Sequence, residues 1–82
     1  MNALRLLLVE DNPKLSQQLG DFLSGLGWQI DYAANGHLAV HLATTQNYDV
    51  VLLDLNLPDL DGLEVCRQIK AEASANVPIL ML

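Results

Sequence analysis

Two short apolar runs in this 82-residue chain each end directly in acidic residues. Residues 6–9 are followed by Glu10 and Asp11, and residues 50–53 are followed by Asp54. Uninterrupted apolar runs of this length are typical of strands that are covered on both faces of a parallel sheet. The carboxyl ends of parallel strands lie at one edge, where ligands bind beside the point at which strand order reverses. We therefore expect Glu10, Asp11 and Asp54 to converge there.

The segment after the first strand, which is predicted over residues 4–9, carries the signals of a helix. Asn12 suits the N-cap and Pro13 the first helical position, while Gly27 can end the helix. Apolar side chains at helical spacing predict one stripe along it, formed by Leu15, Leu19, Phe22, Leu23 and Leu26.

The next two elements are predicted to be an edge strand and a short helix. Trp28, Ile30 and Tyr32 alternate with less apolar residues, which favours a half-exposed strand at the edge of the sheet. Asn35 and Gly36 mark a turn or cap, after which a short amphipathic helix fades into residues 44–47.

The third strand is predicted over residues 50–54, and a loop leads from it to a third helix. Asp61 and Glu64 form an acidic variant of the capping box at the start of this helix. Its apolar positions, which carry the predicted helix to about residue 73, are Leu63, Cys66, Ile69 and Ala73. Residues 78–82 are continuously apolar and predict a fourth strand.

Strands and helices alternate along the chain with short connections. This alternation predicts an α/β fold with a parallel sheet and right-handed crossovers. Because the second strand reads as an edge, the third must pass back over the first, which gives the strand order 2-1-3-4. The first helix then lies alone on one face, and the other two share the opposite face. A chain of 82 residues forms one domain at most.

Composition excludes several classes of function. Ten acidic residues against four basic ones give a net charge of -6, which opposes binding to nucleic acid and to anionic membranes. The apolar run at residues 6–9 is too short for a signal peptide or a membrane span, so we expect neither in these residues. The single Cys66 cannot form an internal disulfide, so we expect a reducing, cytoplasmic setting.

The three acids need compensation if they converge. Two like charges about 4 Å apart repel by roughly 4 kcal/mol at an effective dielectric near 20, so a divalent cation or raised pKa values must relieve the site. Mg²⁺ suits carboxylate ligands, and the main-chain carbonyl of Asn56 can add another oxygen. Asp54, at the end of a buried strand, is the candidate nucleophile that would accept a phosphoryl group.

These residues resemble the receiver domain of two-component response regulators. The resemblance covers the whole chain and rests on four blocks, residues 7–12, 49–58, 61–62 and 78–81. It implies a flavodoxin-like, doubly wound sheet and a module that is not a turnover enzyme. It also implies that Asp54 is the phosphoacceptor and that Glu10, Asp11, Asp54 and the Asn56 carbonyl hold Mg²⁺. The phosphoryl donor would be a histidine kinase, and the output an attached winged-helix DNA-binding domain that controls transcription.

The sequence departs from the receiver pattern at its end. A phosphoryl-contacting Ser or Thr, a lysine on a fifth strand and the last helices would all follow Leu82, so we expect residues 1–82 to be the N-terminal part of a longer receiver domain. The fourth strand would then be a bare sheet edge, which predicts a homodimer or a strand-exchanged oligomer.

Other interpretations stay open on the residues alone. The missing Ser or Thr and lysine favour a phosphorylation-independent dimerisation or scaffold module as the alternative function. An aspartate-nucleophile phosphatase would need a second acid where Asn56 stands. The pair Glu10 and Asp11 could merely be solvated, and His37 and His41 are better explained as a solvated helix face than as metal ligands. The loop acids Asp59 and Asp61 are not predicted to belong to the site.

Overall fold

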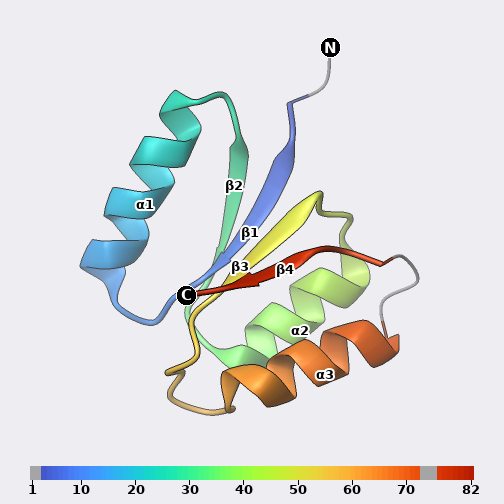
Figure 1. Cartoon of the computed structure of the whole chain (residues 1–82). Helices are drawn as coiled ribbons and strands as arrows, with labels where there is room; N and C mark the ends of the chain where they lie inside the picture. The colour runs from blue at the N-terminus through green and yellow to red at the C-terminus, as the bar shows by residue number, and fades with distance from the viewer. Residues whose placement is uncertain (1–2, 73–75) are drawn as a thin grey trace.

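The computed structural model describes residues 3–72 and 76–82 and shows strands and helices in strict alternation. The order of elements along the chain (Figure 1) is β1 (Arg5–Val9), α1 (Pro13–Gly25), β2 (Gln29–Ala33), α2 (Gly36–Thr45), β3 (Val50–Leu53), α3 (Gly62–Glu72) and β4 (Ile79–Met81).

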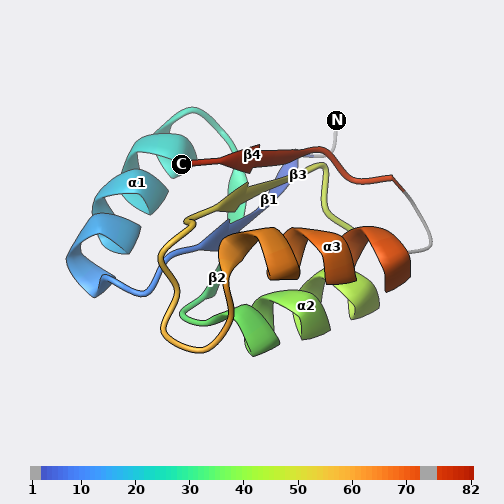
Figure 2. The same cartoon turned by 60° about the horizontal axis from the view of Figure 1, so that its bottom comes forward.

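The strands form one parallel sheet in the order β2-β1-β3-β4. Helix α1 covers one face of this sheet, while α2 and α3 lie side by side on the other (Figure 2). The predicted α/β class, the strand order and the division of the helices between the two faces are therefore confirmed. The strand order reverses between β1 and β3, whose carboxyl ends carry the acidic residues.

The strands are slightly shorter than the apolar runs suggested. Leu4, Trp28 and Asp54 each lie just outside a strand, and β4 covers only Ile79–Met81. The pairing of β3 with β4 nevertheless continues one residue past the end of β4, because the Leu82 N–H donates to the Leu53 carbonyl at 2.9 Å. The predicted end of the third helix at Ala73 lies outside the described residues.

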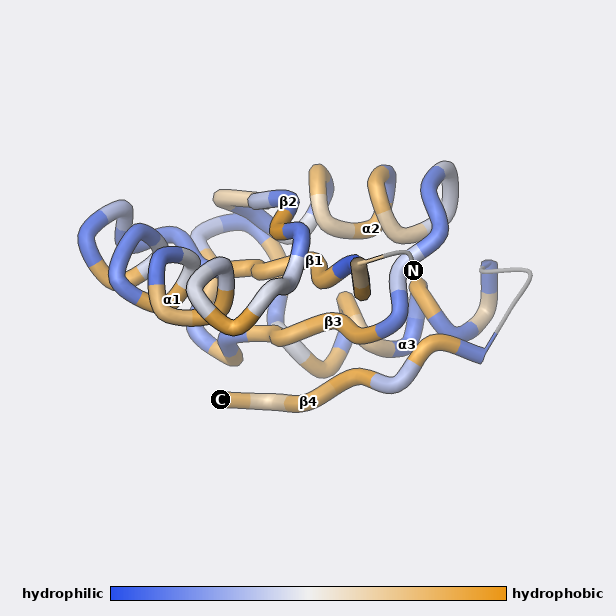
Figure 3. The backbone as a smooth tube through the Cα atoms, turned by 90° about the horizontal axis from the view of Figure 1, so that it is seen from above, coloured by the Kyte–Doolittle hydropathy of each residue, from blue (hydrophilic) through white to orange (hydrophobic). Residues whose placement is uncertain are grey.

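The main core lies between the sheet and the pair α2 and α3. Its fully or nearly fully buried members are Leu7, Val9, Ala33, Ala39, Val40, Ala43, Val51, Leu53, Val65 and Ile69. Leu6 and Leu8 are also buried but lie outside this cluster, as expected for alternate side chains that face α1. Figure 3 shows β1, β3 and β4 mostly in the colour of apolar residues. Apolar strands thus hold the acidic ends of β1 and β3 in place.

The predicted start and end signals of α1 are confirmed. The Asn12 side chain accepts hydrogen bonds from the N–H groups of Lys14 and Leu15 at 3.0 and 3.2 Å, and Pro13 occupies the first turn. Gly27 has a φ of 97°, a left-handed conformation that favours glycine just past a helix.

The apolar stripes were predicted only in part. On α1, Phe22 is 66% exposed and Leu26, beyond the helix end, is 63% exposed, because the sheet reaches only one side of this helix. On α3, Leu63 is 63% exposed, whereas the buried residues are Gly62, Val65 and Ile69. The face of α3 that meets the sheet is thus rotated from the predicted one.

The capping box predicted for α3 was also wrong in one half. The Asp61 side chain accepts the Leu63 N–H at 2.8 Å, as a cap should. Glu64 instead accepts two hydrogen bonds from the Arg67 guanidinium, at 2.6 and 2.9 Å, because Arg67 lies one helical turn away.

No described helix has both the length and the apolar character that a membrane crossing requires.

Candidate metal centre

The register of the sheet brings the ends of β1 and β3 together. Val9 is the last residue of β1, and its partners are Ala33 on β2 and Leu53 on β3. The pattern continues for one more residue, since the Asp54 N–H donates to the Val9 carbonyl at 3.0 Å and the Glu10 N–H to the Ala33 carbonyl at 3.0 Å. Glu10 and Asp54 therefore leave adjacent strands at the same level.

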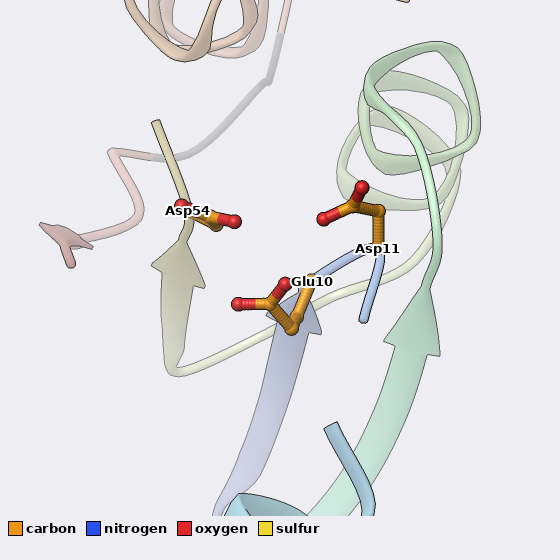
Figure 4. A group of neighbouring side chains, drawn as sticks. All are labelled: Glu10, Asp11 and Asp54. Carbon is orange, nitrogen blue, oxygen red and sulfur yellow. The ribbon is translucent and has the colours of Figure 1, made fainter. Parts of the chain in front are cut away.

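Glu10, Asp11 and Asp54 form one acidic cluster (Figure 4). Each offers a carboxylate oxygen, and these three oxygens lie within 4.8 Å of one another. Glu10 is buried, with 6% of its surface exposed, while Asp54 is half-buried and Asp11 is exposed. Within residues 3–72 and 76–82, no other three acidic, histidine or cysteine side chains come this close. The predicted convergence of the three acids is found in the structure.

Glu10 is the most constrained of the three carboxylates. Burial raises its pKa above the ordinary value, the Asn12 N–H lowers it by donating to Oε2 at 3.0 Å, and the charge of Asp54 raises it again. The net effect is a raised pKa, which means that the folded protein disfavours a charged Glu10. A cation among the three acids would remove this penalty.

The Asp54 carboxylate is oriented by the loop that follows it. Oδ1 accepts the Asn56 N–H at 3.1 Å, and Asn56 in turn forms an isolated antiparallel bridge with Asp61. The structure therefore holds the backbone of Asn56, whose carbonyl was the fourth predicted ligand, beside Asp54.

Gly62 permits a tight passage of the chain beneath Asp54. A Cβ atom at this position would lie 2.8 Å from the Leu55 Cα and 3.1 Å from the Asp54 carbonyl oxygen. Any larger residue would push on the backbone that carries the candidate nucleophile. This close contact explains why glycine stands at position 62.

An open cavity of about 460 Å³ adjoins the cluster on the side of α1. Its lining includes the two acids that follow β1 and the start of α1, and its residues are Glu10, Asp11, Pro13, Ser16, Gln17, Tyr32, Ala33 and Ala34. The cluster is thus reachable from solvent through this cavity.

Asp59 has a role that the sequence did not reveal. Its carboxylate accepts the N–H groups of Gly36 and His37, at 2.6 and 2.9 Å, at the start of α2. Partial desolvation raises the pKa of Asp59, but the hydrogen bonds from His37 and Gly36 outweigh it and hold the pKa far below the usual range. No local pattern signals this pairing, because its partners lie more than twenty residues away in the sequence.

The two histidines of α2 do not form a metal site in the described part of the chain. The His37 ring nitrogen Nδ1 contacts Asp59 at 2.5 Å, and no group of three metal-ligating side chains includes His37 or His41.

The donor set at the acidic cluster fits a hard divalent cation. Mg²⁺ prefers oxygen ligands and is usually bound by one or two carboxylates together with water and phosphate oxygens. Two of the three carboxylates, those of Glu10 and Asp11, line the open cavity, which leaves room for such water and phosphate. The arrangement suits phosphoryl chemistry at Asp54.

Comparison with known protein families identifies the fold as a known one. A family model described as response regulator receiver domain matches residues 6–82. The chain is 39% identical over 79 residues to the transcriptional regulatory protein CusR of Escherichia coli K12, a match that covers 96% of this chain and 34% of CusR. The chain thus spans about a third of the length of this curated relative.

Solved structures agree with this match. The chain resembles the receiver domain of the sensor histidine kinase PA1611 from Pseudomonas aeruginosa PAO1, solved with magnesium coordinated in its active-site cleft. The TM-score is 0.92 and the identity 40%, with 98% of this chain and 66% of that one covered.

A second likeness is to a chain from the crystal structure of the histidine kinase ThkA in complex with the response regulator TrrA. TrrA is from Thermotoga maritima. The TM-score is 0.87 and the identity 35%, with 95% of this chain and 66% of that one covered. Sheet order, acidic strand ends and family match agree, and the chain belongs to the receiver domain family of two-component response regulators.

Proposed function

We propose that Asp54 accepts a phosphoryl group from a histidine kinase, with Mg²⁺ held by Glu10, Asp11, Asp54 and the main-chain carbonyl of Asn56. The observation that carries this proposal is the convergence of three carboxylate oxygens within 4.8 Å at the strand-order reversal. A bound Mg²⁺ would supply positive charge that screens an incoming phosphoryl group from these acids.

The residues of the chain have distinct parts in this reaction. The Asn56 N–H holds Oδ1 of Asp54, and the other carboxylate oxygen attacks the phosphorus atom. A new P–O bond forms while the P–N bond of a phosphohistidine breaks, and its electron pair returns to the imidazole. Glu10 and Asp11 remain unmodified, so the product is an aspartyl phosphate on this chain. The chain is a phosphorylated switch and not a turnover enzyme.

The relatives support the same partner and output. One structural neighbour is a complex between a histidine kinase and a response regulator, and CusR is a transcriptional regulatory protein. We extend both to this chain as proposals: the donor is a histidine kinase, and the output is control of transcription through a DNA-binding domain outside these residues. The charge of -6 opposes direct contact of this chain with DNA.

A phosphorylation assay tests the proposal. The full-length protein is incubated with Mg²⁺ and a phosphorylated histidine kinase or acetyl phosphate, and its intact mass is recorded. We expect one added phosphoryl group in the wild type and in the control Asp21→Asn, and none in Asp54→Asn or after chelation of Mg²⁺. Phosphorylation of Asp54→Asn to the wild-type level would contradict the assignment.

The exposed β4 edge favours one alternative function. Leu80 and Met81 on the outer strand β4 are 57% and 41% exposed, and Leu82 directly after it is 54% exposed. This surface suits a phosphorylation-independent dimerisation or scaffold role. A beryllofluoride phosphoryl mimic separates the two functions. Binding of the mimic with Mg²⁺ supports the phosphorylated switch, and its failure to bind supports the scaffold.

A further inference from the structure

Asp59 joins the loop that follows Asp54 to the amino end of α2. Oδ1 of Asp59 accepts the Gly36 N–H at 2.6 Å, and Oδ2 accepts the His37 N–H at 2.9 Å. Oδ2 also contacts the His37 ring at 2.5 Å. One side chain thus holds two residues of another element through three contacts.

These contacts complete the cap of α2. Asn35 accepts the Leu38 N–H through its side chain at 2.8 Å and the Ala39 N–H through its carbonyl at 3.1 Å. Gly36 and His37 are the first two residues of α2, and their N–H groups have no partner within the helix. Asp59 accepts both. A negative charge at this position is also favoured by the helix dipole. Asp59 therefore links the loop strongly to α2, although its side chain is partly exposed.

The same loop carries Asn56. The other hydrogen bonds of its residues stay inside the loop or reach the start of α3, as in the Asn56 N–H to Asp54 and the Gly62 N–H to the Leu55 carbonyl. Among the side-chain hydrogen bonds of the described residues, those of Asp59 are the ones that tie this loop to a separate element. Without them, the loop would depend on apolar packing, since Leu57 and Leu60 lie against the core to which α2 contributes.

We propose that Asp59 is a positioning residue for the metal site: it fixes the loop against α2 so that the backbone of Asn56 stays beside Asp54. This inference rests on the proposed function, in which the Asn56 carbonyl is a Mg²⁺ ligand. Outer residues that orient metal ligands are often worth about tenfold or more in metal affinity. Asp59 acts on the ligand through the loop backbone and does not touch the ion itself.

Mg²⁺ titration of the full-length protein by calorimetry tests the proposal. Asp59→Ala removes the link, and Asn35→Ala is the matched control because it weakens the same helix end without touching the loop. We expect the Mg²⁺ Kd to rise by about tenfold in Asp59→Ala and by less than about twofold in Asn35→Ala. Asp59→Asn retains an acceptor oxygen and should give an intermediate Kd.

Hydrogen exchange at the Asn56 amide gives a second reading that needs no metal. We expect faster exchange in Asp59→Ala than in Asn35→Ala. Wild-type Mg²⁺ affinity in Asp59→Ala, or an equal loss in both variants, would overturn the positioning role. Absence of Mg²⁺ binding by the wild type would instead overturn the proposed metal site and this inference with it, so the two failures are distinguishable.

Discussion

At the scale of single residues, Glu10 is the carboxylate of the cluster whose negative charge the folded protein most disfavours. It is buried at the end of β1 and has a raised pKa, because it is desolvated and lies beside Asp54. Asp11 and Asp54 lie close to it: one carboxylate oxygen from each of the three residues lies within 4.8 Å of the other two. Without a cation, this cluster opposes folding.

Glu10→Gln should therefore stabilise the protein when Mg²⁺ is removed. Glutamine keeps an acceptor for the Asn12 N–H but lacks the charge, so we expect a gain of about 1 kcal/mol in EDTA. Thermal unfolding with and without Mg²⁺ measures this, and Mg²⁺ should raise the melting temperature of the wild type more than that of the variant. Asp21→Asn, an exposed acid on α1, controls for net charge. A melting temperature of Glu10→Gln that is lower than that of the wild type, both in EDTA, would contradict the account.

At the scale of elements, the start of α3 is fitted tightly under the loop after β3. Gly62→Ala would place a methyl group 2.8 Å from the Leu55 Cα, so the backbone itself must move. We expect a loss of about 1–3 kcal/mol in the free energy of unfolding, measured by urea denaturation.

Gly25→Ala is the matched control for this substitution. Its added methyl group would meet no atom within 4 Å at the end of α1, so it should leave stability unchanged or raise it. Equal stability of Gly62→Ala and the wild type would show that the close approach at Leu55 does not constrain the fold.

The sequence predicted the existence and order of the elements better than their exposed faces. Caps such as Asn12 and Asn35 are local signals, and both were found where predicted. The direction in which a helix meets the sheet is not set by local sequence signals, so on α3 the unpredicted Val65 is buried while Leu63 is exposed.

At the scale of the whole molecule, the acidic site was predictable and the loop attachment was not. Strand order follows from the crossover rule and one edge strand, and this order alone brings Asp54 beside Glu10. The contact of Asp59 with Gly36 joins segments far apart in the sequence, and an Asp in a loop is common without such a partner.

The outer edge of β4 carries a prediction about association. In a polypeptide limited to residues 1–82, the exposed Leu80 belongs to the edge strand β4, so we expect chains to associate through this strand. Light scattering should give a mass above the 9.0 kDa of one chain, and Leu80→Lys should lower it. A monomer mass together with cooperative unfolding would argue against an aggregating edge.

The central claim is that Glu10, Asp11 and Asp54 hold one divalent cation at the strand-order reversal. The most direct measurement is a Mg²⁺ titration of the full-length protein followed by backbone amide NMR, in the wild type and in Asp11→Asn. The account predicts saturable binding of one ion, with shifts concentrated at residues 10–12 and 54–56, and much weaker binding in the variant. Saturable binding that leaves these amides unshifted, or equal affinity in Asp11→Asn, would contradict it.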